Sequence, residues 1–534
     1  MRIRPIFALL PALLLAACSA QTDGGEEDLS KTGEDDFTSN QATLLDFEFD
    51  GQVTATSVFN AQSLINDQML YTIGQLNGSK AVGRLDRLAL TNVQKTTADG
   101  KTTIKYHAKL PVAWGTKTNL PASYELILPA DASFEGQEAF TKEYLHSCVD
   151  FGAHDVDAGS MWYYYRPARN GCQLKPADVQ RFTAKVTPST ENSTGRYPEY
   201  NKVWEDGALN VVAIFGKYED GKTSGDAGID AYNRFVREAR GALGGAVTTV
   251  PETVPQTPGV GTPDVTINAT LPDGKKVSIT ALLVDNVRTA DARFNERYNA
   301  LSTDADLIVY GGHAGLGQNV RALAQKGTWK AGKYVIVFMN GCDTFAYVDG
   351  SLAQTRARIN PDDPTGTKYM EFVTNALPAF FSEMPNSALT MIKGLLRHDS
   401  PMTYEQIFTG IDDSQVVVVT GEEDNTFKPA DAPPPAGWQG VTARVDGLAR
   451  AAERRFDTGV VQPGRYEFKI TGTGDADLYV KVGAAVGGRV YDCRPYKSGS
   501  TETCVVTVRT AANISSMVRG YAATSSVEYS AKKL

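Results

Sequence analysis

The sequence lacks two features that would assign it at once to a common class of protein. Lys and Arg number 53 against 62 Asp and Glu, the net charge is -9, and no basic stripe runs along the chain. Nucleic-acid binding is therefore not expected, because phosphates require clustered cations. Residues 6–17 form the one conspicuous apolar run, which is shorter than the roughly 20 residues needed to cross a membrane. The composition, 42% hydrophobic and 22% charged, is ordinary for a globular protein of several domains.

The N-terminus predicts export. Arg2 and Arg4 precede the apolar run, which ends at residues 15–18 in Leu-Ala-Ala-Cys, and this arrangement is typical of a signal peptide. Small residues directly before a cysteine resemble the lipobox of bacterial lipoproteins. The resemblance implies that Cys18 is lipidated and becomes the mature N-terminus. The alternative is an ordinary secretory signal with an unrelated cysteine.

We assign residues 1–18 to a lipoprotein signal peptide with its lipobox and residues 19–40 to an acidic, flexible tether. The stretch 22–36 holds seven acids and one lysine without apolar periodicity, so it cannot bury enough apolar surface to fold. The predicted location is the cell envelope, with the chain lipid-anchored to a membrane and exposed to the periplasm or the exterior.

Cysteine is scarce, with six residues in the chain. Cys148 and Cys172 bracket a polar, aromatic loop, and Cys493 and Cys504 flank a turn-rich stretch. Both pairs suit disulfides, which the compartment of an exported protein permits. Beside the cysteine of the lipobox, Cys342 is then left as an unpaired thiol.

Residues 41–205 are predicted to form a β-rich N-terminal domain of unknown family. The loop between Cys148 and Cys172 contains His154, Asp155 and Asp157, which together could ligate a metal ion. The alternative is a disulfide-stapled surface loop whose aromatic residues 161–165 form a packing strip. Strand-like alternation occurs at 45–49, 104–110 and 124–128, and a helix is predicted at 64–76.

Residues 206–427 are predicted to form an α/β domain with a mostly parallel sheet. The continuous apolar runs 307–310 and 334–339 indicate strands buried on both faces. Residues 318–326 between them suit the helix of a βαβ unit. The other predicted elements are strands at 209–215, 265–271, 277–287 and 416–419 and helices at 229–243, 290–301, 370–381 and 387–396.

His313 follows the first of these two apolar runs, and Cys342 follows the second. Adjacent parallel strands lie about 4.8 Å apart and end at the same edge of a sheet, so the two side chains are expected to meet. A thiol beside an imidazole supplies a nucleophile and a base. Gly315 and Gly341 would let the backbone turn and present N–H groups to an oxyanion. The alternatives are a buried structural cysteine and a surface histidine.

Residues 310–315 (Tyr-Gly-Gly-His-Ala-Gly) and 340–342 (Asn-Gly-Cys) resemble, in order and placement, the catalytic motifs of the caspase–hemoglobinase fold. This fold is shared by caspases, legumains, gingipains, clostripain and separases. The resemblance covers residues 209 to about 425 and implies that Cys342 is the nucleophile and His313 the general acid/base. It also implies an oxyanion hole made by the backbone N–H groups of Cys342 and of the Ala314-Gly315 turn. Ala314 departs from the His-Gly order that is usual in the family.

A Pro-rich linker is predicted at 428–438, and residues 439–534 resemble the bacterial pre-peptidase C-terminal domain, a small β-sandwich. Such domains accompany secreted enzymes, commonly peptidases. Asp475 and Asp477 are weak candidates for calcium ligands, with turn capping as the alternative. The resemblance rests on the ordered motifs at 474–480, 493–496, 502–504 and 518–521.

These features predict a multidomain protein: a β-rich N-terminal domain, a central caspase-like α/β domain and a C-terminal β-sandwich. The predicted function is that of a cell-envelope lipoprotein acting as a caspase-like cysteine endopeptidase through a Cys–His dyad. Its partners would be a membrane, through the lipid, and a peptide or protein substrate, with no nucleic acid. No cofactor is required in this hypothesis, and calcium is allowed. The alternative is a non-catalytic surface lipoprotein that binds protein or polysaccharide through its β-domains, with the α/β domain as a scaffold.

Overall fold

The computed structural model describes residues 36–534, apart from gaps at 57, 59, 151–154, 244–246, 430–437, 439, 462, 489 and 509–511. The chain divides into two compact units, Met1–Lys428 and Pro429–Leu534. The predicted signal peptide with Cys18, nearly all of the predicted tether and most of the predicted linker lie outside the described residues. No helix within the described ranges is both long and apolar enough to span a bilayer.

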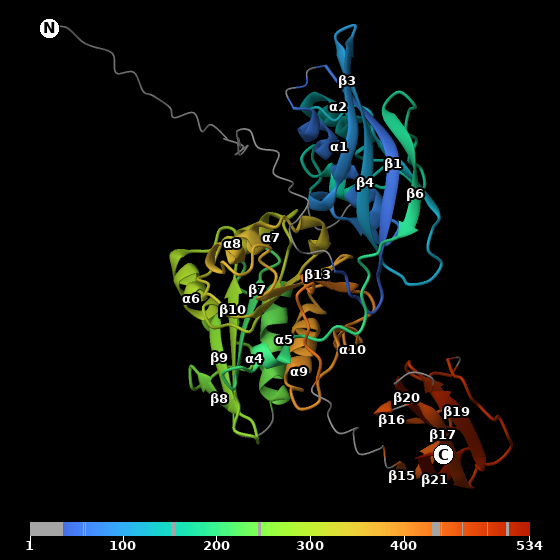
Figure 1. The fold of residues 1–534 in the computed structure, drawn as a ribbon. Helices are drawn as coiled ribbons and strands as arrows, with labels where there is room; N and C mark the ends of the chain where they lie inside the picture. The colour runs from blue at the N-terminus through green and yellow to red at the C-terminus, as the bar shows by residue number, and fades with distance from the viewer. Residues whose placement is uncertain are drawn as a thin grey trace. The chain divides into compact units, whose positions relative to one another are not determined.

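The larger unit begins with an antiparallel sheet in the order β2-β4-β1-β6-β5, and β3 pairs with β4. Buried and exposed residues alternate along β4, as expected for a sheet with one face toward a core. Helix α1 packs beside this sheet (Figure 1), and its N-cap is Asn60, whose side chain accepts the Ser63 N–H. The elements are β1 (Thr43–Ala55), α1 (Ala61–Asn77), β2 (Ala81–Gly83), β3 (Ala89–Ala98), β4 (Lys101–Trp114), β5 (Ser123–Pro129), α2 (Phe134–Tyr144), α3 (Met161–Tyr164) and β6 (Val179–Pro188).

The second part of this unit is an eight-stranded sheet in the order β14-β13-β12-β11-β7-β10-β9-β8. The five strands from β13 to β10 are parallel to one another, and β14, β9 and β8 are antiparallel additions at the edges. The strands are β7 (Ala208–Gly216), β8 (Val247–Val250), β9 (Asp264–Thr270), β10 (Lys276–Val284), β11 (Leu307–Gly311), β12 (Val335–Asn340), β13 (Met370–Asn375) and β14 (Val417–Thr420).

Both faces of this sheet are buried. Along β12, Val335, Val337 and Met339 belong to one apolar core, and Ile336 and Phe338 belong to another. Helices α5 and α9 supply the second core, whereas α6, α7 and α8 pack in the first, which continues into the N-terminal sheet (Figure 1). The helices are α4 (Tyr200–Val203), α5 (Ala227–Ala242), α6 (Ala292–Ser302), α7 (Gln318–Ala324), α8 (Ser351–Ile359), α9 (Met384–Leu395) and α10 (Tyr404–Phe408).

One predicted element is wrong: residues 370–381 do not begin as a helix, because Met370–Asn375 is strand β13. All six of its residues are buried, and one of them is Glu371. The Glu371 carboxylate accepts hydrogen bonds from the hydroxyls of Tyr334 and Tyr404 and from the Asn425 amide. An acid inside a buried strand interrupts the apolar run, and this is why the sequence pattern did not indicate a strand.

The smaller unit contains two antiparallel sheets, in the orders β15-β21-β17-β19 and β16-β20-β18. Phe468 of one sheet and Leu478 of the other belong to one apolar core. The described residues contain two disulfides, Cys493–Cys504 in this unit and Cys148–Cys172 in the larger one. The strands are β15 (Val441–Ala449), β16 (Glu453–Val461), β17 (Gly464–Thr473), β18 (Ala476–Val482), β19 (Glu502–Val508), β20 (Ala512–Gly520) and β21 (Thr524–Lys533).

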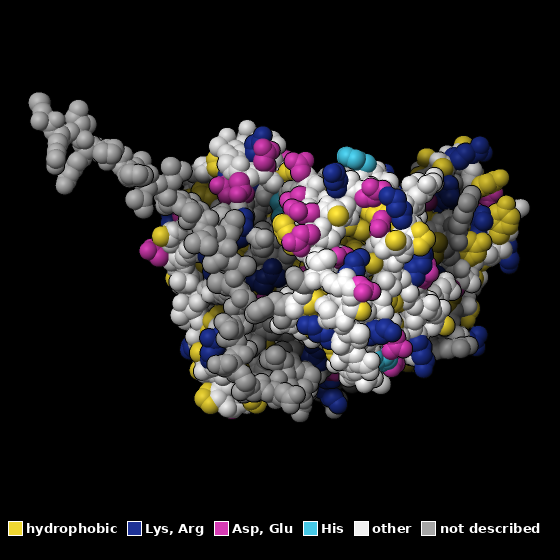
Figure 2. Space-filling view, turned by 90° about the horizontal axis from the view of Figure 1, so that it is seen from above, with side chains coloured by type: hydrophobic (Ala, Val, Ile, Leu, Met, Phe, Trp, Pro, Cys, Tyr) yellow, Lys and Arg dark blue, Asp and Glu magenta, His cyan; other side chains and the backbone are white. Residues whose placement is uncertain are grey.

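Charged side chains of both signs are interspersed on the face of the molecule seen in Figure 2. Among the residues described on that face, Lys and Arg form no continuous stripe.

A buried ion pair before β11 and β12 predicts a stability effect. Lys333 Nζ lies 2.5 Å from Asp306 Oδ1, and both side chains are almost fully buried. The Lys333→Met variant leaves Asp306 uncompensated, so we expect a loss of about 3–5 kcal/mol in the free energy of unfolding. Chemical denaturation of the full chain measures this loss. The double variant Lys333→Met/Asp306→Asn should recover most of it, and equal losses in both variants would contradict the account.

Candidate functional site

His313 and Cys342 come to the same edge of the eight-stranded sheet. Strands β11 and β12 are adjacent and parallel, and Gly311 pairs with Asn340 in their register. His313 and Cys342 each stand two residues beyond that pair. The backbones remain close after the strands end, because a Cβ atom on Gly341 would lie only 2.8 Å from the carbonyl oxygen of Gly312. Glycine at position 341 is therefore required by close backbone approach.

The thiol of Cys342 is partly buried and protonated at neutral pH. It donates a hydrogen bond to the carbonyl oxygen of Ala379, at an S···O distance of 3.5 Å. Burial raises the pKa of the Cys342 thiol to about 11, and the neighbouring Asp343 carboxylate acts in the same direction. A thiol in this environment is a poor nucleophile until the environment changes.

The His313 ring is held between aromatic rings. Its centroid lies 5.1 Å from that of Tyr218 and 5.0 Å from that of Phe381. Nε2 lies 2.9 Å from the carbonyl oxygen of Tyr218. Since a carbonyl only accepts, Nε2 carries the proton in the neutral ring and Nδ1 is the accepting nitrogen. The next residues turn sharply, with Gly315 at φ 61°, and the roles of Ala314, Gly315 and Cys342 as oxyanion donors stay predictions.

A third group at this edge, Asp343, was not singled out from the sequence. It is fully buried and has a left-handed φ of 52°, a conformation that Asp tolerates better than most residues. Its carboxylate accepts hydrogen bonds from Tyr163 Oη and Asn77 Nδ2, both at 2.8 Å. Burial raises the pKa of Asp343 to about 7. The N-terminal part of the unit therefore reaches directly into the candidate site.

Tyr163 belongs to the loop for which the sequence allowed either a metal site or a disulfide-stapled loop with an aromatic packing strip. The structure agrees with the second, because the disulfide is present and residues 161, 162, 164 and 165 pack in the apolar core. The loop lies against the end of β12, where the Tyr163 hydroxyl donates to Asp343. Its position is fixed by Arg166, whose guanidinium donates to the Tyr163 and Gly74 carbonyl oxygens and to Asn77 Oδ1. We call residues 159–166 the tyrosine cap. A run of aromatics after a cysteine was the only sequence signal for this cap.

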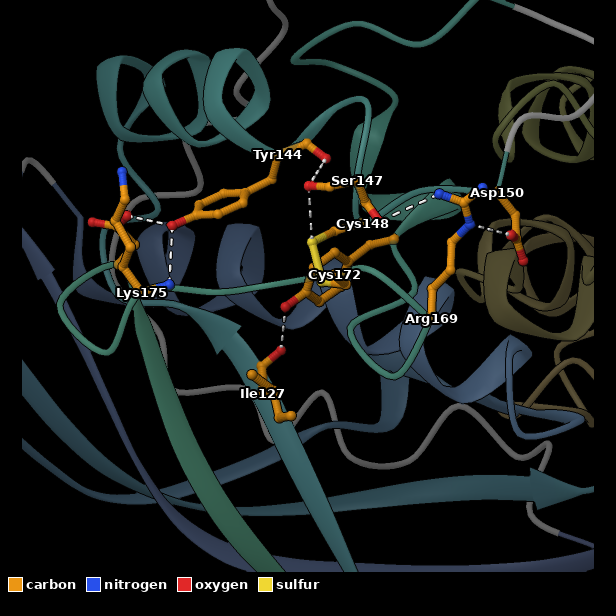
Figure 3. The surroundings of a disulfide bond; sticks show 10 residues. Ile127, Tyr144, Ser147, Cys148, Asp150, Arg169, Cys172 and Lys175 are labelled. Atoms are coloured by element: carbon orange, nitrogen blue, oxygen red, sulfur yellow. Dashed lines mark hydrogen bonds and ion pairs between the residues drawn. A yellow bond between two sulfur atoms is a disulfide. The ribbon is translucent and has the colours of Figure 1, made fainter.

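The Cys148–Cys172 disulfide fastens the loop that carries the cap (Figure 3). Around it, Arg169 donates to the Ser147 carbonyl oxygen at 3.3 Å and lies 3.4 Å from the Asp150 carboxylate. His154 of the proposed metal cluster lies outside the described residues. Asp157 accepts a hydrogen bond from the Ser160 hydroxyl and so acts as a local turn cap.

A cavity of about 350 Å³ lies beside the site, at the carboxyl ends of β7 and β10. The chain leaves β7 toward α5 on one face and leaves β10 toward α6 on the other, and such a switch point is where open α/β sheets form crevices. The cavity is lined by Lys217, Leu282, Asp285, Arg293 and Phe294, among others. Lys217, the residue before Tyr218, forms an ion pair of 2.5 Å with Asp285.

The candidate calcium ligands in the smaller unit are already occupied by protein groups. Asp477 Oδ2 pairs with Arg494 at 2.9 Å, and Asp475 Oδ1 accepts the Gly499 N–H at 3.0 Å. These two acids act as ion-pair and turn-capping groups, so the geometry does not support calcium.

The chain is similar to several proteases over short stretches, and no family model matches it. It is 52% identical over 54 residues to a neutral protease of Vibrio proteolyticus, covering 10% of this chain and 9% of that protein. It is 38% identical over 93 residues to a zinc metalloprotease of Helicobacter pylori (17% and 36%). It is 42% identical over 60 residues to alkaline serine exoprotease A of Vibrio alginolyticus (11% of each). The chain thus covers far less than two thirds of the length of these relatives.

These relatives overturn the predicted enzyme class. They include zinc metalloproteases and no caspase-like cysteine peptidase, so the assignment to the caspase–hemoglobinase family and to a Cys–His cysteine peptidase is wrong. The non-catalytic alternative gains no better support. The prediction that no cofactor is required is wrong as well, because the name zinc metalloprotease implies zinc. The kinds of protease among these relatives are consistent with the predicted exposure outside the cell.

The described residues do not fit a zinc ion. No three His, Cys, Asp or Glu side chains in the described ranges form a group that could hold a metal. His107 and His398 are bonded to the surface carboxylates of Asp50 and Asp273. The order His-Glu-x-x-His, which places two zinc ligands on one helix face, does not occur in the sequence. No catalytic step of this chain is therefore assigned to a metal.

The protonated state of Cys342 predicts slow modification by a thiol-directed alkylating reagent. With a pKa of about 11, its thiolate fraction at neutral pH is roughly a hundredfold or more below that of an ordinary cysteine. The Tyr163→Phe variant loosens the tyrosine cap and should raise the labelling rate about tenfold, since a lost hydrogen bond to a buried carboxylate costs about 1–3 kcal/mol. Mass spectrometry of the peptide that contains Cys342 measures the rate.

The matched control is Tyr144→Phe, which removes a hydroxyl that donates to Asp178 away from the strand ends. Fast labelling of the wild-type protein, or equal rates in the two variants, would contradict the assigned role of the cap.

The raised pKa of Asp343 predicts a pH-dependent stability. Between about pH 4 and 7 the folded state keeps a proton on Asp343 that the unfolded state releases, so this group makes stability fall as pH rises, by at most about 1.4 kcal/mol per pH unit. Asp343→Asn removes this contribution. The free energy of unfolding of the variant, relative to wild type, should therefore rise from pH 4 to 7 in urea denaturation. A difference that is independent of pH would show that Asp343 is already ionised at acidic pH.

Proposed function

We propose that the chain acts on polypeptides outside the cytoplasm, and that it does so at the carboxyl edge of the eight-stranded sheet. The observation that carries the proposal is the short similarity to each of several proteases. The two disulfides favour an oxidising compartment. The names of these relatives have an action on polypeptides in common and differ in catalytic class, so the similarity favours a polypeptide substrate rather than one particular chemistry.

The site that we assign to this function lies between the two strand ends and the cavity. His313 and Cys342 stand at the ends of β11 and β12, and Tyr218 connects His313 to the cavity beside Lys217. The cavity has a lining of mixed polar and apolar residues and lies at a topological switch point, which is where ligands bind in open α/β sheets. An extended polypeptide would place a side chain in the cavity and its backbone beside His313.

The tyrosine cap would have to move for a polypeptide to reach Cys342. Tyr163 is bonded to Asp343, the residue next to Cys342, and the cap is fastened by the disulfide at its base. In this proposal the structure is the closed state of the site. Opening would break the hydrogen bond between Tyr163 and Asp343.

Several finer assignments belong to the same proposal and rest on the sequence. Residues 1–18 would be removed as a signal peptide, with Cys18 carrying lipid and residues 19–40 acting as the tether to a membrane. Residues 41–205 and 206–427 would be the two domains of the larger unit. Residues 439–534 would be a β-sandwich, in agreement with two sheets that share one core.

Release of peptides from an unfolded protein tests the proposed function. The full chain and its Tyr163→Phe variant are incubated with a reduced and alkylated protein, with no addition, with zinc and with a chelator, and fragments are identified by mass spectrometry. We expect fragments, in larger amount with the variant because its cap opens more readily. Absence of fragments in every arm would refute the proposal.

Fragment release by the single variants His313→Ala and Cys342→Ala tests whether the strand-end site is responsible for the activity. Loss of fragments in either variant supports the strand-end site. Undiminished fragment release in both would place the site elsewhere in the chain.

A further inference from the structure

The smaller unit contains a cavity of about 370 Å³ that plays no part in the proposed function. It lies on strands β18 and β20 and on the turn between β15 and β16. Three arginines and one acid carry the charges of its lining. The lining residues are Arg450, Ala451, Asp477, Tyr479, Arg494, Arg519, Gly520 and Tyr521.

The cavity has a surplus of positive charge, although the chain as a whole carries -9. Asp477 is engaged by Arg494 at 2.9 Å. Arg519 Nε lies 3.9 Å from Glu453, which is beyond hydrogen-bond distance, and Arg450 Nε donates to the carbonyl oxygen of Tyr521. Arg494 Nε is buried and has no hydrogen-bond partner among the described residues. A buried donor without a partner indicates that an acceptor is missing from the site.

Aromatic rings frame the same arginine. The Arg494 guanidinium carbon lies 4.7 Å from the ring centroid of Tyr479 and 4.1 Å from that of Tyr496. Tyr479 is buried, whereas Tyr496 is 68% exposed and Tyr521, on the lining, is 60% exposed. Exposed tyrosines beside arginines are the residues most often found at the energetic centres of protein interfaces.

The backbone beside the cavity is strained at two positions. Tyr496 and the lining residue Ala451 have φ values of 56° and 66°. Left-handed backbone at residues other than glycine costs of order 1–3 kcal/mol each and is concentrated at ligand sites. Tyr496 carries one of the rings that contact Arg494, and Ala451 lies in the turn that lines the cavity.

We propose that this cavity binds an acidic polypeptide segment, with side-chain carboxylates on the arginines and the exposed tyrosines against the adjoining residues. The planar fork of a guanidinium matches a carboxylate with two parallel hydrogen bonds. Three arginines are too few to follow a nucleic-acid backbone, which requires a longer basic surface. The cavity belongs to the smaller unit and the strand-end site to the larger one, so this proposal does not depend on the proposed function.

Fluorescence anisotropy of a labelled oligoglutamate peptide, titrated with the full chain at low and moderate salt, tests the proposal. We expect saturable binding that weakens as salt rises, and no binding of the matching oligolysine peptide. The double variant Arg450→Gln/Arg519→Gln keeps the buried ion pair between Asp477 and Arg494 intact and should weaken binding at least about tenfold.

Arg454→Gln is the matched control, because Arg454 is exposed on β16 and is not part of the lining. Equal affinities of the wild type and the double variant would overturn the proposal. Binding of oligolysine as strong as that of oligoglutamate would overturn it too, and so would tighter binding of a polyuronate, which would make the ligand a polysaccharide. The comparisons with oligolysine and with the polyuronate use only the wild-type protein, so the proposal remains testable even if a variant does not fold.

Discussion

The arrangement of the larger unit depends on one buried carboxylate. Asp343 is the residue after Cys342, beyond the end of strand β12. Its two carboxylate oxygens accept hydrogen bonds from Asn77, at the end of α1, and from Tyr163, on α3. A buried carboxylate without partners is costly, so these donors must stay in place while the acid is ionised. The N-terminal sheet, the loop with the Cys148–Cys172 disulfide and the α/β sheet therefore form one structure at this point. One of the two apolar cores extends through both sheets, in agreement with this coupling.

The chemical state of the site follows from this arrangement. Burial at the strand ends raises the pKa values of both Cys342 and Asp343, whereas the hydroxyl of Tyr163 acts in the opposite direction on both groups. The thiol is kept protonated in this state, although an imidazole stands at the neighbouring strand end.

The strand ends could be predicted from the sequence, but their surroundings could not. Continuous apolar runs around Val309 and Val337 indicate buried parallel strands, and the order of a parallel sheet then places His313 and Cys342 at the same edge. Tyr163 and Asp343 are 180 positions apart, and no periodicity relates residues at that separation. Strand β13 was predicted wrongly because it contains the acid Glu371. The hydroxyl groups that allow this acid to be buried lie on other parts of the chain, so the sequence around β13 does not reveal them.

The comparisons limit what this geometry says about chemistry. The positions of two side chains at adjacent strand ends follow from the fold, and one fold supports many different reactions. These positions alone therefore do not identify the reaction. The relatives include metalloproteases and a serine protease, and each match covers a small part of this chain. The described residues contain no group of side chains that could hold zinc. The metalloprotease chemistry of the relatives is therefore not assigned to the strand ends. The polypeptide substrate is the common element that the proposal keeps.

Hydrogen exchange across the contact between the two parts tests the account most directly. Backbone amides in the tyrosine cap and in residues 344–347, which follow Asp343, would be compared between wild type and Asp343→Ala. The account predicts that the variant loses protection in both segments together, although they are far apart in sequence. Loss of protection in residues 344–347 alone, with the tyrosine cap unchanged, would show that Asp343 does not hold the two parts together.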